Sequence, residues 1–155
     1  MRAERSYDTA KIRRVLSEMG PVVAEDGESV EDCHIDPVGV CWLMVYDDSH
    51  DVALYRVSML NSVTFEVHAN VLPTHRARGR HASARSMYRW LLDNSQCQKL
   101  VTWVPCMHTH ILRFAREMGM REEGRLRDSY PKDSKLWDQH LMAIGRAGME
   151  AQCHQ

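Results

Sequence analysis

The chain has 155 residues and a formal net charge of −1, with 44% hydrophobic and 26% charged residues. This composition predicts one globular domain, and it excludes a disordered chain and a protein that binds polyanions through its overall charge. No apolar run reaches the roughly 18 residues of a membrane-spanning helix. The N-terminal segment has no apolar signal-peptide core and the five cysteines have no CxxC spacing, so we expect reduced thiols in a cytoplasmic protein.

The apolar pattern predicts the order helix, three strands, helix, strand, helix, two strands. The predicted helices cover residues 7–19, 82–94 and 109–119, and the predicted strands cover 39–47, 52–60, 63–72, 99–105, 120–130 and 136–145. This order indicates a mixed α/β class, with a strand–loop–helix–strand unit at the centre of a single domain over residues 1–145. Residues 146–155 are expected to form a frayed C-terminal tail.

The predicted strand 63–72 leads into a segment that is rich in arginine. In the strand, Glu66, His68 and Asn70 alternate with apolar residues, so the three polar side chains share one face. The chain continues as VLPTHRARGRHA, residues 71–82, and then as an amphipathic helix. Five arginines and no carboxylate lie between Thr74 and Trp90.

A turn that contains glycine, placed between a strand and a helix, exposes several backbone N–H groups at the positive end of the helix dipole. This geometry suits a phosphate or pyrophosphate, with Gly79 allowing close approach and Arg76, Arg78 and Arg80 adding charge at the rim. Two alternatives remain open: a nucleic-acid backbone as the ligand, or a solvated helix without any ligand. The chain has no reading helix, zinc finger or aromatic RNA-binding signature, which argues against nucleic acid.

The segment VLPTHRARGRHA resembles motif A of the GNAT superfamily of N-acetyltransferases, Val-x-Pro followed by a short spacer and Arg/Gln-x-x-Gly-x-Gly/Ala. The matching residues are Val71, Pro73, Arg76 and Gly79, whereas His81 takes the last small position, next to Ala82. Two downstream segments resemble later parts of the family: HTHILRFAREMGMREEG and EEGRLRDSYPKDSKLWDQHLMAI. The second resembles the closing strands of the branch that acetylates protein N-termini and antibiotics. The resemblance implies a GNAT-like, mostly antiparallel central sheet flanked by helices, with a splayed parallel strand pair at the cofactor site.

The same resemblance implies acetyl-CoA as the donor and an amine, in a protein or a small molecule, as the acceptor. The pyrophosphate would lie on the backbone N–H groups of residues 78–82, and the pantetheine would pair with the strand near residues 69–71. A strand N–H near Val71 would polarise the acetyl carbonyl. The cofactor-binding residues implied in this way are Ala69, Asn70, Val71, Arg76, Ala77, Arg78, Gly79, Arg80, His81, Ala82 and His108.

The acceptor amine must lose a proton before it attacks, and a carboxylate or imidazole can take that proton. Glu66 and His68 are the candidate catalytic residues, Glu66 for its position and His68 for its near-neutral intrinsic pKa. The alternative is that both only face solvent. The sequence departs from the family at His108, where Asn is common, and at Ala115, where the family often has a Tyr that protonates the leaving thiolate.

The histidines of CMHTHI, residues 106–111, fit no standard zinc spacing, so we predict no metal. The first hypothesis is an N-acetyltransferase that uses direct attack in a ternary complex, with an acidic segment from Glu25 to Asp36 favouring a cationic amine. The alternative is a GNAT-fold binding or structural module with little or no catalysis. Small proteins of this type also occur in bacteriophages, so a phage-encoded member in the host cytoplasm is a further prediction.

Overall fold

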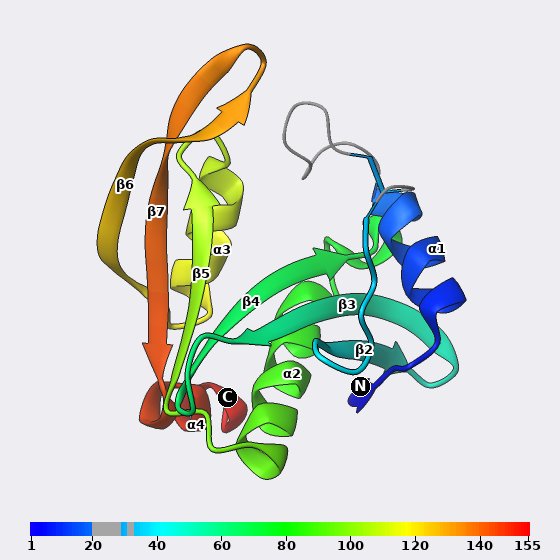
Figure 1. Cartoon of the computed structure of the whole chain (residues 1–155). Coiled ribbons are helices and arrows are strands. Elements are labelled where there is room, and N and C mark those ends of the chain that lie inside the picture. The colour runs from blue at the N-terminus through cyan, green and yellow to red at the C-terminus, as the bar shows by residue number, and fades with distance from the viewer. Residues whose placement is uncertain (20–28, 31–32) are drawn as a thin grey trace.

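The computed structural model of the chain describes residues 1–19, 29–30 and 33–155. The elements are β1 (Arg2–Arg5), α1 (Thr9–Met19), β2 (Cys41–Asp47), β3 (His50–Met59), β4 (Thr64–Val71), the 3₁₀ turn η2 (Pro73–His75), α2 (Arg80–Asn94), β5 (Lys99–Pro105), α3 (Thr109–Glu117), β6 (Arg121–Lys132), β7 (Lys135–Gly145) and α4 (Arg146–Cys153). One sheet of seven strands has the order β1-β2-β3-β4-β5-β7-β6 (Figure 1). None of the helices within the described residues is long and apolar enough to cross a membrane.

All neighbouring strands pair antiparallel except β4 and β5, which are parallel. The ladder between β4 and β5 covers only three pairs, from Thr64–Lys99 to Glu66–Val101. Beyond it, β4 remains paired with β3 up to Val71 and β5 remains paired with β7 up to Pro105. The two strands then diverge, as Figure 1 shows. The predicted mixed α/β class, with a splayed parallel pair in a mostly antiparallel sheet, is confirmed.

Each face of the sheet has its own apolar core, because successive side chains of a strand point to opposite faces. One core packs β3 and β4 residues such as Tyr55 and Val67 against Met87 of α2. The other packs Leu54 and neighbouring β2 residues against Ile12 of α1. The sheet therefore has an α2 face, which α3 also covers, and an α1 face.

Two segments differ from the sequence-based expectation. β1 was not predicted, because four residues with a single partly buried alanine carry almost no apolar pattern; it pairs antiparallel with β2. The frayed tail expected at residues 146–155 is wrong for most of its length, since residues 146–153 form α4. Met149 is fully buried, and Arg85 and Arg89 of α2 donate hydrogen bonds to the carbonyl oxygens of Gln152 and Cys153. A single large apolar residue anchors this helix, too weak a pattern for the sequence analysis.

The hairpin of β6 and β7 is longer than predicted. The expected loop at residues 131–135 shrinks to the turn residues Asp133 and Ser134, both with positive φ (54° and 58°). Two successive positive-φ residues form the tight turn whose twist matches antiparallel strands. At the turn, β6 therefore continues to Lys132 and β7 begins at Lys135, just past the predicted ends at residues 130 and 136.

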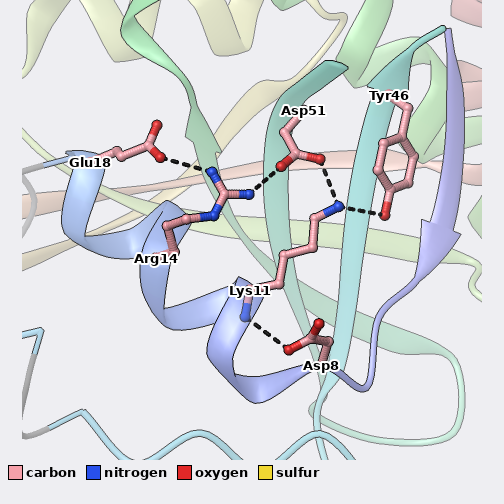
Figure 2. A network of polar contacts seen from close by, with 6 residues as sticks. All are labelled: Asp8, Lys11, Arg14, Glu18, Tyr46 and Asp51. Carbon is pink, nitrogen blue, oxygen red and sulfur yellow. Dashed lines mark hydrogen bonds and ion pairs between the residues drawn. The ribbon is translucent and has the colours of Figure 1, made fainter. Parts of the chain in front are cut away.

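A cluster of charged and polar residues fixes α1 to the β2–β3 hairpin (Figure 2). Lys11 Nζ lies 2.8 Å from Asp51 Oδ1 and 3.3 Å from the Tyr46 hydroxyl. Arg14 donates both to Asp51 and to Glu18. Only 13% of the Asp51 side chain is exposed. Burial by itself raises the pKa of Asp51, but the hydrogen bonds and charges of Lys11 and Arg14 outweigh burial and hold this pKa below its ordinary value.

The lowered pKa of Asp51 gives a pH-dependent stability. Because the native pKa lies below the unfolded one, the stabilisation is fully present above about pH 5 and is lost as the pH falls through the native pKa. We expect Asp51→Asn to lower the free energy of unfolding by about 1–3 kcal/mol near neutral pH and by much less near pH ~3. Urea unfolding at both pH values measures this, with the exposed Asp93→Asn as control. An equal loss at the two pH values would contradict an ionic origin.

Met149 tests whether α4 is part of the folded domain. Met149→Ala removes a fully buried side chain, so we expect the free energy of unfolding to fall by about 2–4 kcal/mol. Met59, which is 66% exposed, supplies a matched control, and Met59→Ala should change the same quantity by less than about 0.5 kcal/mol. Chemical denaturation of the three proteins decides the point; equal effects of the two substitutions would mean that α4 is not docked.

Candidate functional site

A cavity of about 630 Å³ lies where β4 and β5 diverge. Residues 66–70 of β4 and 102–105 of β5 line it. Its walls include Arg56 and Glu66 from the α1 face and Val67 and Met87 from the α2 face. The cavity therefore passes through the sheet between the two strands. Its volume is that of a small-molecule site, and its position lets ligands from opposite faces of the sheet meet.

Five polar side chains line the part of the cavity that belongs to the α1 face: Arg56, Glu66, His68, Asn70 and Gln139. Arg56 lies directly opposite His68 in the β3–β4 ladder. His68 Nε2 lies 3.5 Å from Glu66 Oε2, a contact that becomes an ion pair when the imidazole is protonated. The Glu66 side chain is 19% exposed, whereas Asn70 is only 7% exposed. The face that the sequence analysis identified is thus a cavity wall, and it brings both predicted catalytic residues together.

The loop after β4 presents open backbone donors at the start of α2. Gly79, the residue before the helix, has φ −98° and ψ −15°, so it needs no special backbone freedom. Packing favours glycine instead, because a Cβ there would lie only 3.2 Å from both Cβ and the carbonyl oxygen of His75. Its N–H donates to that same carbonyl oxygen (2.8 Å). Among the described residues, the N–H groups of Arg80, His81 and Ala82 donate to no backbone carbonyl, so three of the predicted donors remain open.

A carboxylate from α3 lies beside these donors. Arg80 Nη2 is 3.2 Å and His81 Nε2 is 3.0 Å from Glu117 Oε2. The His81 ring and the Arg80 guanidinium both contact Phe114, each about 5.3 Å from the ring centroid. Arg80 Nε is buried and has no hydrogen-bond partner among the described residues. No local sequence pattern indicates a contact between residues 36 positions apart, so Glu117 was missed.

Most of the arginines in the predicted basic segment are engaged within the chain. Arg76 donates to the carbonyl oxygen of Val71 (3.2 Å), and Arg80, Arg85 and Arg89 bond to α3 or α4. Arg78 is exposed. A patch that binds a nucleic-acid backbone needs several free cations, so this geometry does not favour that alternative.

The predicted cofactor residues fall into two groups. Those that line the cavity are Ala69, Asn70 and His108. Those around the start of α2 are Arg76, Ala77, Arg78, Gly79, Arg80, His81 and Ala82, and Val71 connects the two groups at the end of β4. Residues Ala84, Met87 and Tyr88 of α2 also line the cavity, so α2 runs from the second group to the cavity. Only an elongated ligand would contact both.

His108 lines the cavity at the residue before α3. Burial lowers its pKa, and the positive charges of His110 and Lys132 lower it further, so the imidazole is largely neutral near pH ~7. Among the described residues, no group of three or more His, Cys, Asp or Glu side chains is arranged to hold a metal ion.

Ala115 stands where the family often has a tyrosine, but three other tyrosines that were not predicted line the same cavity: Tyr55, Tyr88 and Tyr130. Tyr55 shares a hydrogen bond with Ser83 (2.8 Å), and Tyr88 donates to the carbonyl oxygen of Met118 (3.2 Å). Burial raises the pKa of both phenols, so they stay neutral. These tyrosines come from β3, α2 and β6, which is why no single motif revealed them.

The acidic segment expected at an acceptor entrance lies largely outside the described residues, which omit 20–28 and 31–32. Cys33 of that segment lines the cavity. The Asp36 carboxylate accepts hydrogen bonds from the N–H groups of Val38 and Gly39, both 2.9 Å, so it closes a turn. These two bonds lower the pKa of Asp36.

Several solved structures have a fold similar to that of this chain. The chain is similar over 96% of its length to 96% of spermidine N-acetyltransferase from Vibrio cholerae, solved with CoA and spermine, with a TM-score of 0.78 and 15% identity. A chimera of that enzyme, SpeG, with hSSAT gives a TM-score of 0.80 at 14% identity, covering 97% of this chain and 99% of the other. YncA, an acetyltransferase described as putative, from Salmonella typhimurium, solved with acetyl-CoA, gives 0.70 at 15% identity and covers 94% of each chain.

At these identities the solved structures establish the fold alone, which is that of the GNAT superfamily. No curated protein matches the sequence. Residues 9–155 match the model of a family described as "Protein of unknown function (DUF2824)". The chain therefore belongs to the DUF2824 family and has the GNAT fold.

Proposed function

We propose that the protein is an acetyltransferase that moves an acetyl group from acetyl-CoA to an amine. The observation that carries this proposal is the combination of open backbone donors at the start of α2 with a cavity between β4 and β5. Structures of the same fold that were solved with CoA or acetyl-CoA support it.

The residues present fit such a donor. The N–H groups of Arg80, His81 and Ala82 suit a pyrophosphate, and the buried Nε of Arg80 lacks an acceptor that a phosphate oxygen would supply. Past Glu66, β4 has no partner on the side of β5, so its backbone groups there can pair with the amides of a pantetheine arm. Arg80 offsets the charge of Glu117, which would otherwise repel a phosphate, and His81 contacts the same carboxylate oxygen.

Acetyl-CoA would supply the thioester, and side chains of the cavity would accept one proton and donate another. We assign the acceptor proton to Glu66 and His68, which lie 3.5 Å apart on the wall of the α1 face. The amine nitrogen then forms its bond to the acetyl carbon as the carbon–sulfur bond breaks, and the departing sulfur takes up a proton. We assign that second proton to Tyr130, which lines the cavity from β6 and is 7% exposed.

Acetyl-CoA binding tests the cofactor half of the proposal. A ligand that binds only the native state raises its stability, so acetyl-CoA at about 100 times its Kd should raise Tm by roughly 5–10 °C. Acetyl-pantetheine, which lacks the pyrophosphate, should give a much smaller shift because it cannot use the donors of α2. No shift at millimolar acetyl-CoA would reject the proposal. Binding without thiol release over a broad amine panel would instead assign a binding module.

Glu66→Gln and His68→Ala test the catalytic half. We expect each substitution to lower kcat by about 10–100-fold, because each removes a proton acceptor, while the Kd for acetyl-CoA stays unchanged. Thiol release measures kcat, and isothermal titration measures the Kd. The control is Glu4→Gln, because Glu4 lies on β1, is exposed and does not line the cavity. Unchanged kcat in both variants would remove these residues from the mechanism.

A further inference from the structure

Arg56 is a cation on the cavity wall that has no partner within the described chain. It comes from β3, a central strand of the sheet, and is partly buried. Among the described residues it makes no hydrogen bond or ion pair, whereas Arg14, Arg80 and Arg146 all do. A guanidinium presents five N–H donors in a fixed planar geometry, and within the described residues none of those of Arg56 is engaged. Because Arg56 lines the cavity, these donors face a ligand that binds there.

The neighbours of Arg56 narrow the chemistry of that ligand. Asn70 is 7% exposed and lines the cavity, and its side-chain amide makes no hydrogen bond with another described residue. Glu66 is the one carboxylate among the described residues that line the cavity. The β3–β4 part of this wall therefore has one strong cation, one amide, one imidazole and one anion in close succession. A ligand that complements it presents both a carboxylate and an amine.

We propose that Arg56, assisted by Asn70, binds the carboxylate of the acceptor, and that the acceptor is a free α-amino acid. This inference rests on the proposed acetyltransferase function. Arg56 lies directly opposite His68, and such cross-strand neighbours have Cβ atoms about 5 Å apart. The spacing suits an amine and a carboxylate attached to one carbon. A guanidinium also matches a carboxylate through two parallel hydrogen bonds.

A polyamine acceptor fits this wall less well than an amino acid. A polyamine, such as the spermine in the complex of the similar Vibrio cholerae enzyme, carries only positive charge. It would bring that charge next to Arg56 without offering Arg56 a carboxylate, which disfavours binding. Trp42 and Leu16, which also line the cavity, indicate an amino acid with an apolar side chain.

Matched acceptor pairs test the inference. Leucine, methionine and phenylalanine are compared with their carboxamides and with spermidine, and kcat/KM is measured by thiol release at saturating acetyl-CoA. The amino acids should exceed their amides by about 10–100-fold, the value of a charge-assisted pair. Arg56→Met should abolish this preference by lowering kcat/KM for the amino acids alone, and Arg56→Lys should retain part of it. Arg121→Met, an exposed arginine of β6 away from the cavity lining, should change neither value.

Equal kcat/KM for amino acids and amides, a preference for spermidine, or an equal loss of both activities in Arg56→Met would overturn the inference. Failure of the proposed function has a different signature, since acetyl-CoA then neither stabilises the protein nor releases thiol with any acceptor. In that case calorimetric binding of the same amino acids to the wild type and to Arg56→Met still decides the carboxylate site. Binding that Arg56→Met abolishes supports it, and absence of binding rejects it. Unaltered Tm values for the Arg56 variants show that they remain folded.

Discussion

The short parallel ladder between β4 and β5 is the constraint on which the rest of the molecule depends. Three residue pairs hold the strands together, and the outer partners β3 and β7 hold each strand in place where the two diverge. Backbone N–H and C=O groups that lose their ladder partners inside a protein need others. The sheet therefore contains, near its centre, a strand edge that is open to a ligand. The cavity exists because the outer pairings do not allow the strands to close it.

This divergence joins two regions that are otherwise separate. The α2 face has its own core and carries the open donors at the start of α2, whereas the α1 face has a second core and carries Glu66 and His68. The ion pairs of Asp51 hold α1 against the sheet. Leu16 of that helix lines the cavity, so these ion pairs also help to position a cavity residue. The charged cluster in Figure 2 thus shapes one wall of the site without contacting it.

The sequence was informative where residues that act together are close along the chain. The alternation of Glu66, His68 and Asn70 and the loop before α2 each lie within one local segment, so both were predicted. β1 and α4 were missed because their apolar patterns are too sparse, and the contact of His81 with Glu117 was missed because no local pattern connects α2 with α3. Arg56 did leave a signal that was not used, since a charged residue in the apolar run VALYRVSML is unusual in a central strand.

In the proposed reaction, Arg56 would also link acceptor binding to proton transfer. A proton that moves to His68 creates a positive charge directly opposite a guanidinium, which is unfavourable while Arg56 has no counter-ion. A carboxylate bound at Arg56 neutralises that guanidinium and makes protonation of His68 easier. An acceptor without a carboxylate leaves the two positive charges facing each other. The same arginine would therefore act on both steps, first by holding the amino acid and then by allowing its amine to lose a proton. In the proposed reaction, charge on this wall, rather than the net charge of the chain, would decide which amines react.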